Sequence, residues 1–249
     1  MKKQVKFKNY FNEYLSGILE NSRSGHIILL LHGFCGNKDE NGLFSECAKY
    51  FLDRGLNTFR FDVSGVGESE GEFEYSSLRK QASDLNAVVD NLAEKSPYSK
   101  LGLVGFSLGA AVALQSRNPR IRAYSFWSPA FFPSKDMFPR YNSIENRVQL
   151  KEKGHIQKNG VKIGREMMED IREFDASEIL SYFSIPAQII HGTKDPRIDY
   201  RSSINAMKYL NHDSSLVLIE GANHSYKDNP AHRYKVFKES ADWFISKLK

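Results

Sequence analysis

The sequence has very little cysteine. Only Cys35 and Cys47 occur in 249 residues. Their spacing is not that of a metal site, and two thiols are too few for the disulfide framework of a small secreted scaffold. The cysteine content therefore fits a reduced, cytoplasmic setting.

Long apolar runs are missing as well. No segment approaches the roughly 20 apolar residues that span a bilayer. The basic start, MKKQVKFKNYFNEYL, is interrupted by Asn9, Asn12 and Glu13, where a signal peptide has a continuous apolar core. The sequence thus predicts no membrane span and contains no evident secretion signal.

Blocks of like charge are also absent. The 35 Lys and Arg are scattered among 30 Asp and Glu, for a formal net charge of +5. Such a mixture is typical of a solvated surface rather than of a nucleic-acid footprint. With 41% hydrophobic residues and no internal repeat or long linker, the chain is expected to fold around a large core.

The stretch LGLVGFSLGAAVALQSR, residues 101–117, is the most informative in the chain. A short apolar run ends in GFSLG, and the following alanines, valine and leucine favour a helix. The residue between strand and helix must adopt a strained backbone, and its neighbours have no room for a Cβ. We therefore expect Ser107 at the tip of a nucleophile elbow, near helix N-H groups that stabilise negative charge. A glycine-rich corner with an incidental serine is the alternative.

Strand and helix patterns alternate on both sides of this stretch. Two antiparallel edge strands are expected at 5–7 and 14–19, and the apolar run HIILLL at 26–31 is typical of a strand buried on both faces. Further strands are expected at 57–61, 101–104, 121–127, 187–191 and 215–219, and helices at 43–52, 77–93, 201–210 and 230–248. This alternation predicts an α/β fold with a mostly parallel central sheet, helices on both faces and functional residues at the strands' C-terminal ends.

The alternation is interrupted between residues 129 and 183. Three prolines break an aromatic-rich segment, residues 155–163 read as a hairpin about an Asn-Gly turn, and residues 166–174 read as a helix. We interpret 129–183 as a small cap inserted into a core made of 1–128 and 184–249. The aromatic side chains of this cap form either a wall of the substrate site or the cap's own core.

Three strand ends carry the residues of a hydrolytic site: Ser107, Asp195 in HGTKD and His224 in EGANH. A serine hydroxyl is a weak nucleophile, so a neutral imidazole must take its proton. A carboxylate on the other ring nitrogen fixes the tautomer and stabilises the charged ring. The backbone N-H groups of Leu108 and Phe34 are the expected oxyanion donors.

Other residues could compete for these roles. Asp199 is an alternative to Asp195, but it is better placed to cap the helix that follows. His32 and His191 also end strands, each before a glycine, and are expected to be packed and hydrogen-bonded. Cys35 has no elbow around it and is expected to be a small buried residue.

The motifs HGFCGN, RFDVSGVGESEG, GFSLG, HGTKD and EGANH occur in the order and rough spacing of the α/β-hydrolase superfamily. The chain most resembles its bacterial cinnamoyl and feruloyl esterase branch, over about residues 27–243 and most weakly over 131–174. The resemblance implies a carboxylic ester hydrolase with Ser107 as nucleophile, His224 as general base and Asp195 as its orienter. It also implies Phe34 and Leu108 as oxyanion donors. Relatives often carry a histidine before the serine and a glutamine after it, so GFSLGA leaves the shape of the acyl pocket open.

The sequence therefore predicts a serine esterase that works through an acyl-enzyme, on hydroxycinnamoyl or short-chain acyl esters. The aromatic preference rests on the resemblance alone. A thioesterase, monoacylglycerol lipase, peptidase or carbon-carbon hydrolase could use the same residues. A non-catalytic binding protein needs the pocket but not the proton relay. The expected partner is a small-molecule ester; no nucleic acid, metal or organic cofactor is expected, and a homodimer stays open.

Overall fold

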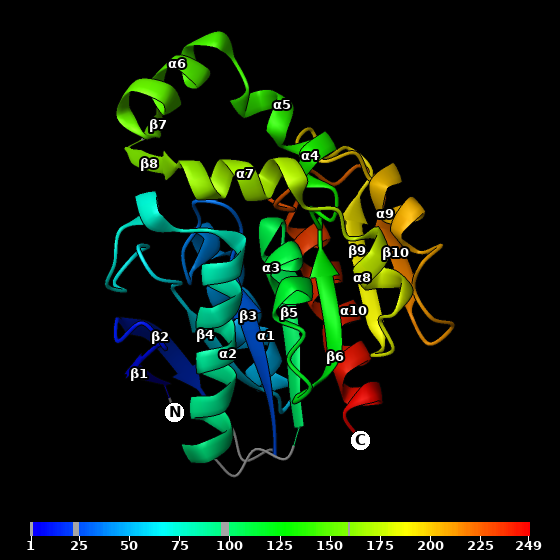
Figure 1. The fold of residues 1–249 in the computed structure, drawn as a ribbon. Helices are drawn as coiled ribbons and strands as arrows, with labels where there is room; N and C mark the ends of the chain where they lie inside the picture. Colours follow the sequence, from blue (N-terminus) through cyan, green and yellow to red (C-terminus); the bar gives the residue numbers. More distant parts are fainter. Residues whose placement is uncertain (1, 22–24, 96–99, 159) are drawn as a thin grey trace.

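The computed structural model describes residues 2–21, 25–95, 100–158 and 160–249. Its centre is an eight-stranded sheet with the order β1-β2-β4-β3-β5-β6-β9-β10, and β7 and β8 form a separate hairpin (Figure 1). The strands are β1 Lys2–Lys8, β2 Tyr14–Glu20, β3 His26–Leu31, β4 Asn57–Phe61, β5 Lys100–Phe106, β6 Ile121–Trp127, β7 His155–Lys158, β8 Val161–Gly164, β9 Ala187–Gly192 and β10 Ser215–Ile219.

The helices alternate with these strands along most of the chain. They are α1 Leu43–Asp53, α2 Leu78–Lys95, α3 Leu108–Ser116, α4 Pro133–Asp136, α5 Phe138–Tyr141, α6 Ile144–Lys153, α7 Arg165–Glu173, α8 Ser177–Ser181, α9 Arg201–Ala206 and α10 Pro230–Lys247. Short 3-10 turns lie at Glu40–Gly42 and Phe73–Tyr75. None of the described helices is long and apolar enough to cross a bilayer.

In the large sheet, the neighbouring strands β4-β3-β5-β6-β9-β10 pair in parallel. The pairs β1-β2 and β2-β4 at the N-terminal edge are antiparallel. The mostly parallel sheet is therefore confirmed, but one detail of the prediction is wrong. Of the two N-terminal strands, β1 lies at the edge and β2 does not, because β2 pairs with β1 on one side and with β4 on the other. The alternation of β2 is that of a short antiparallel strand, which an inner position also permits.

Helices cover both faces of the sheet, as expected. Alternate side chains of β3 point to opposite faces: Leu29 and Leu31 join the cluster with α2 and α3, whereas Ile28 and Leu30 join the cluster with α1 and α10. Figure 1 shows α2 and α3 in front of the sheet and α1 and α10 behind it. Burial on both faces explains why the five residues after His26 in HIILLL are all apolar.

The segment between β6 and β9 lies across the end of the sheet where the parallel strands finish (Figure 1). The expected hairpin is present as β7 and β8, although Asn159 of its turn lies outside the described residues. The expected helix 166–174 is α7, whose side chains Met167, Met168 and Ile171 are buried. These side chains belong to the same apolar cluster as the sheet face below them, so the division into core and cap stays a prediction.

Candidate active site

Ser107 lies at the turn between β5 and α3, where its backbone has φ 53° and ψ −120°. This conformation is strained for a residue with a Cβ. The flanking glycines make the turn possible: a Cβ on Gly105 would lie 3.0 Å from Ala110 Cα, and one on Gly109 only 2.5 Å from the His32 carbonyl oxygen. The Ser107 N-H donates to the Trp127 carbonyl at 2.9 Å, which ties the turn to the neighbouring strand end.

Hydrogen bonds connect Ser107, His224 and Asp195. His224 Nε2 lies 3.1 Å from Ser107 Oγ, and His224 Nδ1 lies 2.6 Å from Asp195 Oδ2. Because a carboxylate only accepts hydrogen bonds, Nδ1 carries the proton and Nε2 can accept one from the serine hydroxyl. The parallel register brings the ends of β5, β9 and β10 to one edge of the sheet, which lets residues 107, 195 and 224 meet.

The Asp195 carboxylate is saturated with donors. Oδ1 accepts the N-H groups of Arg197 at 2.7 Å and Ile198 at 3.0 Å, and Oδ2 accepts His224 and His191, the latter at 3.1 Å. Burial alone would raise the pKa of this carboxyl, but the hydrogen bonds from His191 and His224 outweigh burial and hold the pKa below its usual value. Asp195 is therefore charged at neutral pH.

His191 is a buried partner of this carboxylate that the sequence did not indicate. Its Nδ1 lies 2.6 Å from Ser203 Oγ, and its Nε2 faces both Asp195 Oδ2 and, at 3.2 Å, the Ile198 carbonyl oxygen. Since both groups near Nε2 are acceptors, Nε2 carries the proton and Nδ1 accepts from the Ser203 hydroxyl. The expectation of a packed, hydrogen-bonded histidine is met, and the contact with Asp195 adds to it.

The two expected oxyanion donors flank Ser107. Leu108 is the first residue of α3, and Phe34 follows Gly33, whose ideal Cβ would lie 3.0 Å from Ser107 Cβ. Within the described part of the chain, neither the Phe34 nor the Leu108 N-H donates to another backbone group or side chain. Both are therefore available to a ligand.

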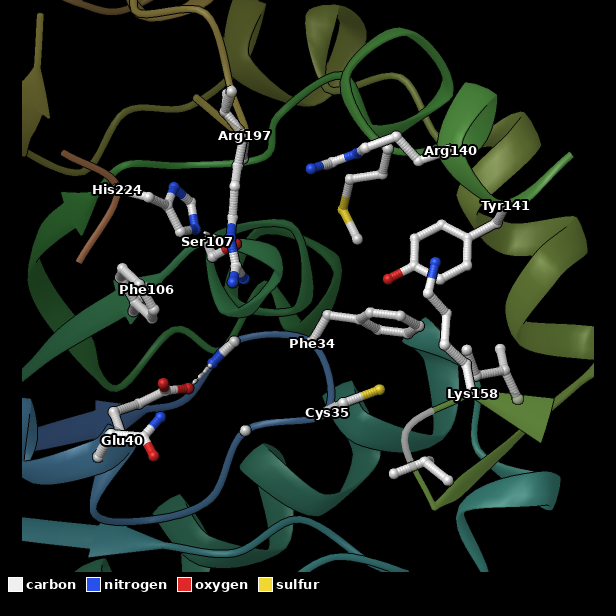
Figure 2. Close-up of a pocket in the computed structure, with 17 residues that line it drawn as sticks. Phe34, Cys35, Glu40, Phe106, Ser107, Arg140, Tyr141, Lys158, Arg197 and His224 are labelled. Atoms are coloured by element: carbon white, nitrogen blue, oxygen red, sulfur yellow. Dashed lines mark hydrogen bonds between the residues drawn. The ribbon is translucent and has the colours of Figure 1, made fainter. Parts of the chain in front are cut away.

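Glu40 supports the loop that carries Phe34, a role that sequence reasoning missed. Its Oε1 accepts the Gly33 N-H at 2.7 Å (dashed in Figure 2). Burial raises the pKa of this carboxyl, although His32 and the Gly33 hydrogen bond oppose the shift. The spacing of seven residues between Gly33 and Glu40 gives no sequence signal for such a contact.

A cavity of about 480 Å³ opens onto Ser107 and His224. Its walls come from the Phe34 loop, from the 129–183 segment and from the loop after β9 (Figure 2). The lining residues are Gly33, Phe34, Cys35, Gly36, Glu40, Asn41, Phe106, Ser107, Met137, Arg140, Tyr141, Lys158, Val161, Ile163, Arg197, Ile198 and His224. The Phe34 ring contacts Phe73 and Tyr141, with ring centroids 5.9 and 5.4 Å apart.

The expectation that Cys35 is buried is wrong. Cys35 is exposed and lines the cavity because its backbone, with φ 54°, turns there. The atoms packed around the thiol still desolvate it and raise its pKa to about 12, against a smaller opposing effect of Lys158. Cys47 is the buried cysteine.

The other competing residues lie where the sequence suggested. Asp199 is exposed, and its carboxylate accepts the Arg201 N-H at 2.9 Å at the start of α9. That helix ends at Ala206 rather than at the expected Leu210. His32 is buried, with Nδ1 2.9 Å from the Gly33 carbonyl and Nε2 accepting the Val63 N-H. Within the described ranges, no cluster of three or more His, Cys, Asp or Glu side chains could hold a metal ion.

Curated relatives are similar over parts of the chain. A 31.7 kDa protein from the traX-finO intergenic region of Escherichia coli is 34% identical over 114 residues, which cover 45% of this chain and 39% of that protein. The mitochondrial palmitoyl-protein thioesterase ABHD10 of Pongo abelii is 26% identical over 76% of this chain and 63% of that protein. The matched regions thus span less than two thirds of either relative.

Solved structures are similar over nearly the whole chain. Est1E from Butyrivibrio proteoclasticus, solved with ferulic acid, superposes with a TM-score of 0.83 at 20% identity and covers 98% of this chain and 99% of its own. Mouse ABHD10 superposes with a TM-score of 0.79 at 19% identity over 99% of this chain and 100% of its own. These likenesses concern the fold, which is the α/β-hydrolase fold. Residues 22–160 match the Hydrolase_4 family, so the chain belongs to the family described as serine aminopeptidase, S33.

Proposed function

We propose that this protein is a serine hydrolase of carboxylic esters or thioesters, with Ser107 as nucleophile, His224 as general base and Asp195 as the residue that orients it. The observation that carries the proposal is the hydrogen-bonded chain from Asp195 through His224 to Ser107 Oγ, at 2.6 and 3.1 Å, at the wall of a cavity. A structural serine has no need of such a relay.

The reaction follows from the atoms at the site. His224 Nε2 removes the proton from Ser107 Oγ as the oxygen attacks the acyl carbon, and the N-H groups of Phe34 and Leu108 stabilise the resulting oxyanion. The imidazolium then protonates the departing alcohol or thiol, leaving an acyl-serine. A water molecule, deprotonated by the same nitrogen, releases the acid and restores Ser107.

We propose an ester as the first substrate class, with a hydroxycinnamoyl or short-chain acyl group. Its support is the resemblance of the motifs to feruloyl esterases, together with a cavity of about 480 Å³, the lower part of the range for small-molecule sites. A thioester is the second candidate, since ABHD10 relatives are palmitoyl-protein thioesterases. We further propose that residues 129–183 form a cap whose Met137, Arg140 and Tyr141 face the acyl or leaving group.

The test is a panel of p-nitrophenyl acetate, butyrate and octanoate, methyl ferulate and an acyl-CoA, assayed with wild type and Ser107→Ala. We expect Ser107→Ala to lower kcat by about a thousandfold or more, with an unchanged melting temperature. The control is Ser181→Ala, which removes an exposed hydroxyl from α8 and should leave every rate unchanged. A rate peak on ferulate supports the aromatic preference, and a peak on acyl-CoA supports the thioester.

Comparable turnover by wild type and Ser107→Ala would show that another group is the nucleophile. If no substrate reacts, labelling by a fluorophosphonate decides the matter, because the label requires an activated serine. A wild-type protein that binds a ligand in the cavity yet never labels would overturn the proposal in favour of a binding protein.

A further inference from the structure

Three cationic side chains line the cavity beside Ser107. Arg140 comes from α5, Lys158 from the end of β7 and Arg197 from the loop after β9. In the close-up, the three side chains extend from different walls into the same space (Figure 2). They are far apart in sequence, so the fold gathers them.

None of the three forms an ion pair with a carboxylate within the described residues. Arg140 donates from Nη2 to the Asp136 backbone carbonyl at 2.8 Å, and Lys158 Nζ lies 4.4 Å from the centroid of the Tyr141 ring. The Arg197 backbone N-H donates to Asp195 Oδ1, while its guanidinium has no hydrogen-bond acceptor within the described residues. All three have free donors.

Some arginines on this surface form ion pairs, whereas Arg79, Arg122 and Arg147 have no carboxylate partner within the described residues. Arg54 pairs with Asp242 at 2.6 Å, Arg201 with Asp199 at 3.2 Å and Arg233 with Glu46. Arg140, Lys158 and Arg197 are distinguished by their position, because all three line one cavity. A scattered net charge of +5 does not account for this shared position.

The cavity lining also offers little negative charge. Its only carboxylate among the described lining residues is Glu40, which is engaged by the Gly33 N-H. Asp195 faces two histidines and two backbone N-H groups rather than the cavity. The walls thus present three cations against one carboxylate.

The positive charges act on the same part of the cavity. Burial raises the pKa of the Tyr141 hydroxyl, and the charges of Arg140 and Arg197 both oppose that shift. Lys158 lies over the ring of the same tyrosine. Within a concave cavity, such converging charges attract an anion more strongly than they would on an open surface.

We propose that the substrate carries an anionic oxygen group, a carboxylate or a phosphate, away from the scissile bond, and that Arg140, Lys158 and Arg197 bind it. The inference rests on the proposed hydrolase function and narrows its substrate class. The planar guanidinium groups of the two arginines match the paired oxygens of either group, and the lysine adds a compact charge.

Two matched pairs of substrates test the inference. The first is p-nitrophenyl butyrate beside the mono-p-nitrophenyl ester of glutaric acid, which adds a carboxylate to the acyl side. The second is 1-butyrylglycerol beside its 3-phosphate, which adds a phosphate to the leaving group. We expect the anionic member of at least one pair to have a kcat/KM about tenfold higher, and the responding pair identifies the side. This advantage should shrink as NaCl is raised.

Variants link the preference to the three cations. Arg140→Gln, Lys158→Gln and Arg197→Gln should each lower the ratio of anionic to neutral kcat/KM by about fivefold, the upper range for exposed charge pairs. Lys151→Gln removes an exposed charge from α6 outside the cavity, so this control should keep the wild-type ratio.

Failure of the inference differs from failure of the hydrolase function. Serine-dependent hydrolysis of the neutral members, with no advantage for the anionic ones, overturns the inference and leaves the function standing. If no member of either pair is hydrolysed, calorimetric titration of Ser107→Ala with glycerol 3-phosphate and with glycerol still tests the site. Binding of the phosphate alone, weakened by Arg140→Gln but not by Lys151→Gln, supports the inference, and equal or no binding overturns it.

Discussion

Asp136, at the end of α4, carries a buried carboxylate oxygen without a hydrogen-bond partner in the described structure. Burial raises its pKa from 3.8 to about 6, although His191 and Arg140 oppose the shift. The folded protein then holds this proton more tightly than the unfolded chain, so stability falls as the pH rises from about 4 to about 6 and stays lower above.

We expect Asp136→Asn to raise the free energy of unfolding at pH 8 by on the order of 1 kcal/mol, a value reduced from the full shift because the residue is partly exposed. At pH 4 the difference in the free energy of unfolding between Asp136→Asn and wild type should nearly vanish. Urea denaturation at both pH values measures it. Asp199→Asn is the control, because the Arg201 N-H lowers the pKa of that carboxyl and the substitution should then destabilise at pH 8. An equal effect of Asp136→Asn at both pH values would contradict the expectation.

His191 gives a second expectation at this scale. His191→Ala removes a donor from Asp195 Oδ2, and we expect kcat to fall about tenfold with little change in KM, since a hydrogen bond to a charged group is involved. His191→Gln, whose amide nitrogen can take the place of Nε2, should recover part of kcat. Steady-state kinetics on the best ester of the panel measures both. Equal losses in the two variants would indicate packing alone.

The sequence predicted Ser107, His224 and Asp195 because each follows directly on a recognisable strand, and parallel strands end at one edge of a sheet. The hydrogen bonds between these three side chains are known from the structure, because the spacing of residues along the sequence does not predict them. The contact of Glu40 with Gly33 and that of His191 with Asp195 could not be predicted, because they depend on the directions that individual side chains take. Cys35 was misjudged for the same reason, since a positive φ redirects its side chain.

At the scale of elements, α3 packs directly against the end of β3. A Cβ on Gly109 would lie 2.5 Å from the His32 carbonyl and 2.6 Å from that of Leu31, both backbone atoms. Alanine in a helix is usually about 1 kcal/mol more favourable than glycine. At Gly109, the collision of an added Cβ with these two carbonyl oxygens should make alanine less favourable than glycine.

We expect Gly109→Ala to destabilise the protein by about 1–3 kcal/mol, as overpacked cores do, and to lower kcat, because the displaced backbone leads into Phe34. Gly154→Ala is the control: that glycine also resists substitution, through its φ of 79°, but nothing lies within 4 Å of its ideal Cβ. It should lose stability without losing kcat. Thermal melting and kinetics on both variants separate the effects, and a stabilised Gly109→Ala would refute the close packing.

Most elements could be predicted, because apolar runs and helical spacing are local properties. The inner position of β2 could not, since a two-residue period does not say how many neighbours a strand has. The early end of α9 at Ala206 is a local boundary of the kind that periodicity defines poorly.

At the scale of the whole molecule, burial is uneven. β5 is buried over 101–106, whereas α6 has no buried residue and leaves Ile144 71% and Val148 46% exposed. Local stability follows such differences, because regions with few buried contacts open at little free energy. The strand order and the position of the 129–183 segment were beyond prediction, since they depend on long-range packing.

We expect hydrogen exchange to be fastest in α6 among the helices of the 129–183 segment and slowest in β3 and β5. Amides of α6 should exchange through local opening, independent of the global unfolding free energy, and those of β5 only through global unfolding. Native-state exchange followed by mass spectrometry measures this. Uniform protection across α6 and β5 would show that the segment and the sheet open together, and that residues 129–183 are no separate cap.

The opposite environments of the two cysteines give the protein an intrinsic probe. Cys35 is exposed at the cavity wall, whereas Cys47 is enclosed by the core. Thiol reagents should therefore attach at one position in the native protein, slowly and faster toward alkaline pH, since the thiolate is the reactive form. A fluorophore placed there would report occupancy of the cavity by any ligand, including one that the enzyme does not turn over.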